Sequence, residues 1–180
     1  MTPKMTKTNK LLVSGINFSI RQATPEDASS LEKLMLEIAQ WLKDKGSTQW
    51  NELLQGKDVH HLMQKITANE VFLVSQNEQI AGAMILQNTP SDWDKSLWQE
   101  KTHKKACYLH RLMVSRLFSG YQLSLAMIKY AESLTRSEQI PRLRLDTKSD
   151  VPFLNKLYQS AGFTLKGVQK GYSLYEKVLY

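Results

Sequence analysis

The sequence contains a single cysteine, Cys107, among its 180 residues. A lone cysteine excludes a disulfide within the chain, and this sparing use fits a reducing compartment such as the cytoplasm. Long apolar runs are also missing, because no segment reaches the roughly 18 consecutive apolar residues that a membrane-spanning helix needs. We therefore expect a cytoplasmic protein that does not cross a membrane.

The N-terminal 17 residues carry three lysines and only one short apolar run, Leu11 to Val13. A secretory signal needs an apolar run of about 7 to 15 residues, so this segment does not qualify. We expect residues 1–17 to form a loose N-terminal extension. The remaining residues, 18–180, have the length of one domain, since domains commonly run to about 100 to 200 residues.

Acidic residues are fewer than basic ones, 17 against 24, which gives a formal net charge of +7 and a pI near 9.4. This excess favours anionic partners, namely nucleic acid, anionic lipid headgroups or a phosphorylated cofactor. The lysines are spread along the chain rather than gathered in a dense block, which favours a solvated positive surface over a nucleic-acid groove. A basic nucleic-acid-binding module remains an alternative that charge alone supports.

Apolar spacing predicts the elements of the first half. Alternation predicts a strand, and apolar residues three and four apart predict a helix. Thr24 can cap a helix that has Pro25 at its first position and acids in its first turn. The expected elements are a strand at 18–21, a helix from 24 to about 46, a short helix at about 58–66, and a hairpin of strands at 71–74 and 80–86.

The second half opens with a polar stretch, residues 88–105, which we expect to be a long loop with one helical turn. Further periodicity predicts a strand at 106–114, a helix at 122–135, a strand at 142–147, a helix ending at Gly162, and strands at 163–167 and 172–179. No repeat or low-complexity segment is present. Strands and helices in this order predict a mixed α/β (α+β) fold with helices on both faces of one sheet.

Two segments carry the functional signal, "LHRLMVSRLFSGYQLSLAMIKYAE" and "LRLDTKSDVPFLNKLYQSAGF". With the order of elements, they resemble the GNAT superfamily of acyl-CoA-dependent N-acetyltransferases over roughly residues 18–180. The family's second motif, Asn-x-x-Tyr-x-x-x-Gly-Phe, is matched by Asn155, Tyr158, Gly162 and Phe163. The resemblance implies a single GNAT-like domain with a mixed, mostly antiparallel central sheet.

The family's first motif, an Arg-Gly-x-Gly-x-Gly turn after a strand, is matched only in part. Counting from Val114, Ser119 stands at the arginine, Gly120 at the first glycine, and Gln122 and Ser124 at the other two. Glycine lets a pyrophosphate approach backbone N–H groups at a helix N-terminus. Gln122 either crowds the phosphates or points outward and leaves the backbone usable.

The resemblance assigns a cofactor role to the turn and to the strand before it, whose backbone would pair with pantetheine amides and polarise the thioester carbonyl. Nearby Arg116 is a candidate replacement for the missing family cation. The implied cofactor-binding residues are Leu112, Met113, Val114, Ser119, Gly120, Tyr121, Gln122, Leu123, Ser124 and Asn155.

The resemblance also implies catalytic roles. Tyr158 would donate a proton to the departing coenzyme A thiolate, since phenol and thiol pKa values are about 10 and 8.5. Asn155, on the same helix face, would hold pantetheine or the helix itself. His110 stands where family members often carry a glutamate base, and histidine titrates near neutral pH. The alternatives are a packed tyrosine with its hydroxyl satisfied and a strand histidine bonded to its neighbours.

Acceptor-site candidates lie in the two long loops, where the resemblance places the acceptor. They are Trp50 in the first loop and Trp93 with Trp98 in the second, and Asp92 and Asp94 flank Trp93. Aromatic and acidic groups together suit a cationic amine. The alternative is that these tryptophans fasten loops to the core or form a homodimer contact. Cys107 is expected to be inert core, and no histidines have the spacing of a metal site.

The implied function is transfer of an acetyl group from acetyl-CoA to an amine of a small molecule or peptide, directly within a ternary complex. No metal, membrane or nucleic-acid partner is expected. The departures at Ser119 and Gln122 keep open a degenerate relative that has the fold and binds acyl-CoA weakly without catalysis.

Overall fold

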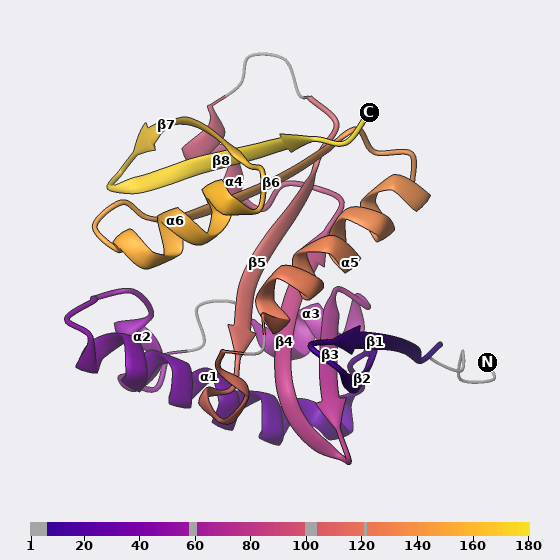
Figure 1. Cartoon of the computed structure of the whole chain (residues 1–180). Coiled ribbons are helices and arrows are strands. Elements are labelled where there is room, and N and C mark those ends of the chain that lie inside the picture. The colour runs from indigo at the N-terminus through magenta and orange to yellow at the C-terminus, as the bar shows by residue number, and fades with distance from the viewer. Residues whose placement is uncertain (1–6, 58–60, 100–103, 121) are drawn as a thin grey trace. The chain divides into compact units, whose positions relative to one another are not determined.

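Eight strands form one sheet (Figure 1) in this computed structural model, which describes residues 7–57, 61–99, 104–120 and 122–180. The strands are β1 (Asn9–Val13), β2 (Ile16–Gln22), β3 (Val71–Gln76), β4 (Gln79–Gln87), β5 (Cys107–Val114), β6 (Arg142–Lys148), β7 (Thr164–Gln169) and β8 (Tyr172–Val178). Their order in the sheet is β1-β2-β3-β4-β5-β6-β8-β7. Pairing is antiparallel for β1 with β2, β2 with β3, β3 with β4, β6 with β8 and β7 with β8, and parallel for β5 with β6. The predicted mixed, mostly antiparallel sheet of a single α/β domain is confirmed.

Helices connect most of these strands. They are the 3-10 helices η1 (Pro25–Asp27) and η2 (Arg116–Phe118) and the α-helices α1 (Ala28–Asp44), α2 (Asn51–Leu54), α3 (Leu62–Thr67), α4 (Asp92–Trp98), α5 (Leu123–Ser137) and α6 (Pro152–Ser160). Within the described ranges, none of them combines the length and apolarity that a bilayer span requires. The parallel pair β5 and β6 is joined through α5, as parallel strands require a crossover connection.

The chain divides into two compact units. The first comprises Met1–Ile85 and Arg111–Ala126, and the second comprises Leu86–His110 and Met127–Tyr180. Strands β4 and β5 and helix α5 therefore contribute residues to both units.

In the first unit, α1 buries one apolar stripe, as its three- and four-residue spacing predicts. Thr24 and Asp27 form a capping box ahead of this helix, and Arg21 binds both oxygens of Asp27 at 2.7 and 2.9 Å. These bonds hold the strand-to-helix turn that the sequence predicts. The buried residues of the stripe are Leu31, Leu34, Met35, Ile38, Ala39 and Leu42.

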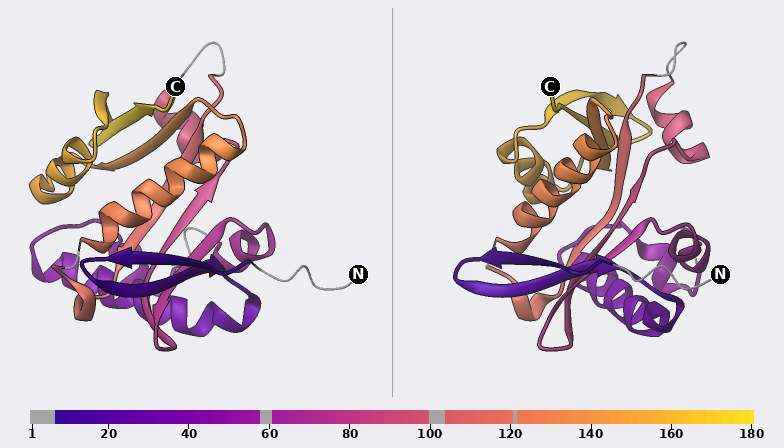
Figure 2. Two further views of the ribbon diagram at one scale, coloured as in Figure 1. Left: turned by 45° about the vertical axis from the view of Figure 1, so that its right-hand side comes forward. Right: turned by 90° about the vertical axis from the view of Figure 1, so that its right-hand side faces the viewer.

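The N-terminal segment is more ordered than we expected. Residues 1–6 lie outside the described part of the chain, but β1 pairs with β2 along its whole length, as the indigo hairpin in Figure 2 shows. Ser14 and Gly15 both have positive φ, at 50° and 77°, the geometry of a tight two-residue hairpin turn. The expectation of a loose extension over 1–17 was therefore wrong for residues 9–17. These residues form a hairpin because their tight turn and strand pairing do not require a long apolar run.

In the second unit, β8 lies between β6 and β7, and α6 runs alongside them (Figure 1). Lys177 of β8 joins this strand to two helices. Its ammonium donates to the Glu132 carboxylate of α5 at 2.6 Å and to the Ala161 carbonyl at the end of α6 at 2.9 Å. Gly162, with φ of 90°, ends α6 where a Cβ would meet the Lys177 side chain at 3.4 Å.

The second unit contains a buried ion pair. Arg144 is 1% exposed, and its Nε donates to Glu176 at 2.8 Å. The same guanidinium donates to the Tyr108 hydroxyl at 3.3 Å and stacks 4.1 Å from the ring centroid of Trp98. A buried cation needs such partners, because its desolvation is costly.

The polar stretch at 88–105 contains α4, a helix of seven residues, where we expected a loop with one helical turn. Ser91 caps it by accepting from the Asp94 backbone N–H at 3.2 Å, and Asp94 reaches back to the Ser91 N–H at 2.8 Å. The Ser-x-x-Asp signature of this capping box is present in the sequence, and the many charged residues around it concealed it.

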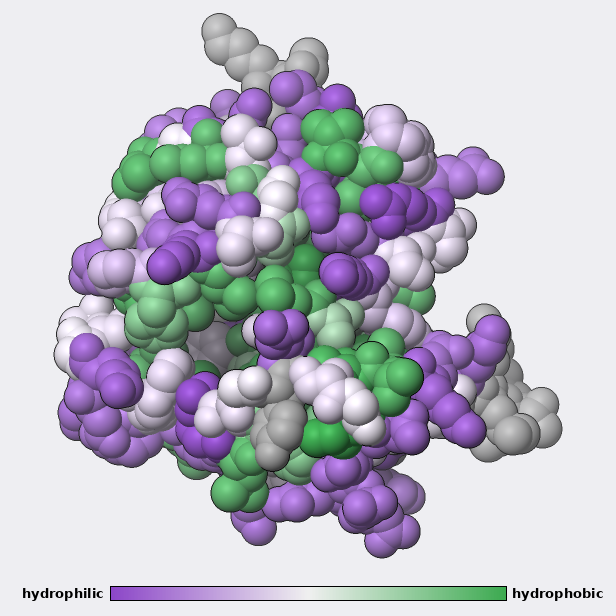
Figure 3. Space-filling model, viewed as in Figure 1, coloured by the Kyte–Doolittle hydropathy of each residue, from purple (hydrophilic) through white to green (hydrophobic). Residues whose placement is uncertain are grey.

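Strand β7 at the sheet edge leaves apolar side chains in solvent. Leu165 is 46% exposed and Val168 52%. Figure 3 shows green apolar surface over the part of the second unit where this strand lies. Lys166 and Lys170 accompany them, and charged residues on an edge discourage pairing with other chains.

Candidate functional site

The turn that follows β5 is held by one carboxylate within the first unit. Glu37 of α1 accepts the backbone N–H of Arg116 at 2.9 Å and the Ser115 hydroxyl at 3.3 Å. The Ser115 N–H donates to the carbonyl of Ala81 in β4 at 2.8 Å. These bonds fix the path of the chain from the end of β5 into the turn.

The turn keeps a left-handed backbone at two of the family's glycine positions. Gly120 has φ of 83° and Gln122 has φ of 59°. A Cβ at Gly120 would meet no atom within 4 Å, so its glycine is required by conformation and not by crowding within the protein. Gln122 adopts the backbone conformation that a glycine would supply, at the cost of strain. Tyr121 lies outside the described residues.

Helix α5 begins directly after this turn, with Leu123 buried and Ser124 half-buried. The first backbone N–H groups of a helix have no acceptor within the helix, and the helix dipole adds positive potential there. The geometry therefore suits an anion such as a pyrophosphate. Ser119 is exposed beside it. The guanidinium of Arg116 stacks 4.1 Å from the ring centroid of Trp41, and whether it also contacts phosphate stays a prediction.

The middle of β5 contains an irregularity that the sequence does not signal. Arg111 has φ of 49° in the middle of the strand, and a left-handed residue there interrupts regular pairing. Its guanidinium is buried and lies 4.4 Å from the ring centroid of Trp50, which is itself left-handed with φ of 66°. Trp50 thus stacks on an arginine of β5. Leu112, Met113 and Val114 follow, and Met113 is the most buried of the three.

In the second unit, β5 and β6 place two polar pairs on one face. Their parallel register sets Tyr108 opposite Arg144, and side chains two residues apart along a strand share a face. His110 and Asp146 are each two positions further on. His110, Asp146 and Asp94 of α4 accordingly come together, with one polar atom from each within 4.8 Å of the others.

The contacts of His110 are short. Its Nε2 lies 3.1 Å from the Asp94 carboxylate, whose side chain is 1% exposed against 10% for His110. The same carboxylate oxygen accepts from the Ser91 N–H, the Ser91 hydroxyl and the Gln87 amide at 2.8, 2.7 and 3.1 Å. Protein donors thus satisfy Oδ2 of Asp94, whereas Oδ1 of Asp146 is buried without a hydrogen bond to any described residue and Oδ1 of Asp94 has only its contact with His110 at 3.1 Å.

The two carboxyl groups beside His110 have opposite pKa shifts. Burial favours the neutral acid at Asp94, but the hydrogen bond and charge of His110, together with the bonds from Ser91, outweigh burial and lower the pKa. At Asp146, burial is the largest effect and raises the pKa, although His110 and the Trp93 hydrogen bond oppose it. The cluster therefore contains one carboxylate that holds its charge firmly and one that resists ionisation.

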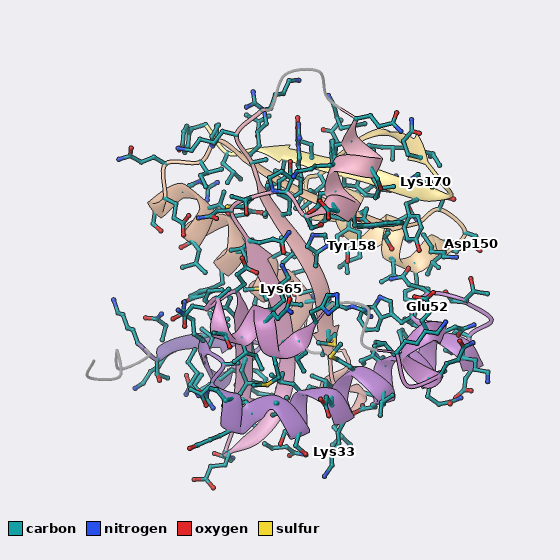
Figure 4. The ribbon with its side chains drawn as sticks, turned by 180° about the vertical axis from the view of Figure 1, so that it is seen from behind. Lys33, Glu52, Lys65, Asp150, Tyr158 and Lys170 are labelled. Atoms are coloured by element: carbon teal, nitrogen blue, oxygen red, sulfur yellow. The ribbon has the colours of Figure 1, made fainter. Side chains whose placement is uncertain are left out.

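Tyr158 of α6 is buried, as Figure 4 shows by contrast with the surface residues Asp150 and Lys170 of the same unit. Its ring lies 6.2 Å from that of Phe163 and 5.9 Å from that of Tyr175. Burial, followed by the charges of Asp146 and Tyr175, raises the pKa of the Tyr158 phenol above its ordinary value. The phenol consequently keeps its proton across the neutral range.

The amide of Asn155 is engaged within the protein. Its Nδ2 donates to the carbonyls of Lys148 and Val151, both at 2.9 Å, and its Oδ1 accepts from the Tyr175 hydroxyl at 2.7 Å. These bonds tie α6 to the end of β6 and to β8. The role of Asn155 in holding the helix is therefore visible, whereas a contact with pantetheine stays a prediction.

The tryptophans of the second unit have different environments. Trp93 is 38% exposed, donates its indole N–H to Asp146 at 3.2 Å and meets the Tyr172 ring edge-on at 5.0 Å. Trp98 stacks on buried Arg144, which fits the alternative of a tryptophan that fastens α4 to the core. Asp92 is fully exposed, with Lys95 at 3.9 Å. The structure brings Trp93, but not Asp92, to the His110 cluster.

Asp94 and Asp146 are the functional candidates that the sequence reasoning missed. Asp146 follows Arg144 in the alternating strand Arg-Leu-Arg-Leu-Asp, so an inward-facing acid was visible in the pattern. Asp94 was considered only as an acidic neighbour of Trp93, although its position in a capping box signals a carboxylate with a fixed orientation. Cys107 is buried and its thiol pKa is raised by burial, as an inert core thiol would be.

Comparison with known proteins gives a consistent result. The model of the Acetyltransferase (GNAT) family matches residues 35–163. The uncharacterized N-acetyltransferase YesJ of Bacillus subtilis (strain 168) is 38% identical over 156 residues, which is 86% of this chain and 87% of that protein.

Solved structures agree with this match. The crystal structure of a GNAT family acetyltransferase from Listeria monocytogenes is 45% identical, with a TM-score of 0.83 over 95% of this chain and 100% of that one. The PaiA N-acetyltransferase of Thermoplasma acidophilum, solved in complex with coenzyme A, is 14% identical with a TM-score of 0.73, covering 89% of this chain and 98% of its own. At that identity the likeness concerns the fold alone.

Proposed function

Since this chain belongs to the acetyltransferase (GNAT) family and is therefore an acyltransferase, we propose that it moves an acetyl group from acetyl-CoA to an amine of a small molecule or peptide. Transfer is direct, within a ternary complex, and no acyl-enzyme forms. The burial of Cys107 supports the last point, because a buried thiol of raised pKa is a poor nucleophile.

Donor binding is assigned to the turn after β5 and the start of α5. The left-handed Gly120 and Gln122 and the N-terminal N–H groups of α5 support this assignment, since they form a backbone site for the pyrophosphate. Leu112, Met113 and Val114 are assigned to the pantetheine arm through their backbone groups. The side chain of Gln122 points outward in this proposal and leaves the backbone N–H groups accessible.

His110 is proposed as the general base. An amine that arrives as ammonium must lose a proton before its lone pair can attack the thioester carbonyl. In the proposal, the imidazole takes that proton and later releases it to solvent. The position of His110 between Asp94 and Asp146 supports this role, because the adjacent carboxylate stabilises the imidazolium while it exists.

Tyr158 is proposed as the general acid. When the carbon–sulfur bond breaks, the phenol gives its proton to the thiolate and regains one from solvent afterwards. The raised pKa means that the phenol carries its proton at neutral pH, as a proton donor must. It also makes the phenol a weaker acid than free tyrosine, so the transfer depends on closeness to the sulfur rather than on acidity.

The observation that carries the proposal is the cluster of His110, Asp94 and Asp146, whose polar atoms lie within 4.8 Å of one another. Asp146 is also one of the groups that raise the pKa of the Tyr158 phenol, after burial itself. The base candidate and the acid candidate belong to the same unit of the protein, which supports pairing them in one reaction. Perturbed titratable groups that cluster in this way are typical of reaction sites.

The acceptor is proposed to approach Trp93, the exposed aromatic of this cluster. An aromatic face next to a carboxyl group attracts an ammonium ion. Trp50, stacked on Arg111, is the second aromatic candidate for the acceptor site.

Thermal unfolding with and without acetyl-CoA tests the first step. A ligand of the native state at 100 times its dissociation constant adds about 2.7 kcal/mol of stability, which is several degrees in melting temperature. A shift with acetyl-CoA supports donor binding, and no shift at millimolar concentration supports the degenerate alternative. An amine panel scored by thiol release then tests the chemistry, and binding without turnover on any amine would also favour that alternative.

A further inference from the structure

Two consecutive residues of α4 bind side chains from two different strands. Trp93 donates its indole N–H to Asp146 of β6 at 3.2 Å, and the Asp94 carboxylate lies 3.1 Å from Nε2 of His110 in β5. His110 and Asp146 share a face because their strands pair in parallel two residues earlier. Helix α4 thus covers this face and contacts both polar groups at once.

The Asp94 carboxylate is held in one orientation. One of its oxygens accepts the Ser91 N–H, the Ser91 hydroxyl and the Gln87 amide within 3.1 Å, and the side chain is 1% exposed. A carboxylate bound by three protein donors has little freedom to rotate. It therefore presents a fixed acceptor to the imidazole.

We propose that Asp94 is a positioning residue for His110 that fixes the imidazole tautomer with the proton on Nε2 and the unshared pair on Nδ1. This inference rests on the proposed function, in which His110 is the base. An ionised carboxylate can only accept a hydrogen bond, so the nitrogen that faces it must carry hydrogen. The lowered pKa of Asp94 supports this requirement, because the group stays ionised near neutral pH.

This tautomer determines which ring nitrogen takes up the proton. A proton moves from the acceptor ammonium to Nδ1, and the imidazolium that results still donates Nε2–H to Asp94. Release of the Nδ1 proton to solvent restores the starting state. Among the described residues, the titratable groups that lie against the ring include Asp94 on α4 and Asp146 on β6, and Asp146 in turn raises the pKa of Tyr158 of α6.

If Asp94 acted only as a helix cap, its replacement would not change which nitrogen of His110 carries hydrogen. Asp94 also completes the capping box of α4, so its replacement affects the helix whether or not it positions His110. Ser91→Ala is the matched control, because it removes a capping hydroxyl but leaves the Asp94 carboxylate with two of its three donors, the backbone N–H of residue 91 and the Gln87 amide. Asp94→Asn removes the charge and supplies an amide that can donate to the ring.

The test reads the tautomer directly by nitrogen-15 NMR of the full-length protein labelled at histidine, with His110 assigned from a His110→Gln variant. We expect Nε2–H in the wild type and in Ser91→Ala. In Asp94→Asn we expect loss of the single Nε2–H form and a lower titration midpoint of the ring, because an anionic partner is gone. A wild-type ring protonated on Nδ1 would overturn the proposal, and this result needs no variant to fold.

Kinetics provide a second readout. With an amine identified by the thiol-release panel, Asp94→Asn is expected to lower kcat about 10²-fold or more and to move the pH at which kcat/KM rises, while Asp94→Glu partly restores the rate. Equal pH profiles for Asp94→Asn and Ser91→Ala would reduce Asp94 to a helix cap. If no amine is turned over, the proposed function fails while the NMR result still decides the tautomer.

Discussion

Gly120 and Gln122 lie two residues apart before α5, and both have a left-handed backbone, with φ of 83° and 59°. Glycine adopts this conformation without cost, whereas a residue with a Cβ loses about 1 kcal/mol or more. The turn therefore has the backbone of a glycine at Gln122, although this position and Ser124, the other two glycine positions of the family motif, both carry a side chain. Gln122 can therefore affect the turn in two ways, through backbone strain and through the bulk of its side chain, and substitutions at this position can separate them.

Gln122→Gly is expected to raise the free energy of unfolding by about 0.5 to 1 kcal/mol, because it relieves the strained φ. Thermal or urea unfolding measures the gain. Gln122→Ala is the matched control, since it shortens the side chain and retains the strain. Calorimetry measures the affinity of both variants for acetyl-CoA. If both bind it more tightly than the wild type, the Gln122 side chain crowds the donor. If Gln122→Gly binds it less tightly, the side chain contacts the donor, which contradicts an outward-pointing side chain.

Tyr158→Phe is expected to lower kcat by about 10²- to 10⁴-fold, the usual contribution of a general acid, with nearly unchanged affinity for acetyl-CoA. Steady-state kinetics and calorimetry measure the two quantities. Tyr175→Phe serves as the control, because it removes the hydroxyl that binds Asn155 from a ring 5.9 Å away. An unaltered kcat in Tyr158→Phe, or an equal loss in both variants, would remove Tyr158 from the acid role.

Asp146 gives a prediction for stability against pH. Burial raises its folded-state pKa above the ordinary value of about 3.9, so the folded state binds this proton more tightly than the unfolded state does. The contribution of Asp146 to stability is therefore greatest in acid, and it is lost as the pH rises through the folded pKa. Asp146→Asn cannot ionise and keeps an oxygen that can accept from Trp93.

The free energy of unfolding of Asp146→Asn, relative to the wild type, is accordingly expected to increase between about pH 4 and pH 7. Urea denaturation of both proteins at several pH values measures this difference. A difference that stays constant over that range would show that Asp146 ionises in the folded protein as it does in the unfolded chain.

The buried pair of Arg144 and Glu176 predicts strong coupling. Arg144→Met leaves a carboxylate that is 7% exposed without its closest cation, and the expected loss is about 3 to 5 kcal/mol. Arg144→Met with Glu176→Leu is expected to lose less than Arg144→Met alone, because no unpaired charge remains. Losses that simply add in urea unfolding would mean that the two groups do not interact.

Local patterns accounted for most of the elements. The stripe of α1, the Thr24 cap and the alternation of β6 each depend on neighbours within a few residues, so the sequence was sufficient to predict them. The turn at Ser14 and Gly15 was a local signal too, and it was overlooked in a lysine-rich segment. The 3-10 start of the first helix depends on the Arg21–Asp27 pair, which spans only six residues.

The site depends on longer-range contacts. His110 and Asp94 are 16 residues apart, and Trp93 and Asp146 are 53 apart. Single-sequence reasoning can propose each residue by its type, but the register of β5 with β6 decides which of them meet. Arg111 shows the limit most clearly, because its left-handed backbone and its stacking on Trp50 follow from tertiary packing and leave no trace in composition.

Lys177 of β8 fastens both α5 and the end of α6 to this strand. Loss of its ammonium would therefore release the end of the helix that carries Tyr158, although no residue of the proposed reaction would be changed.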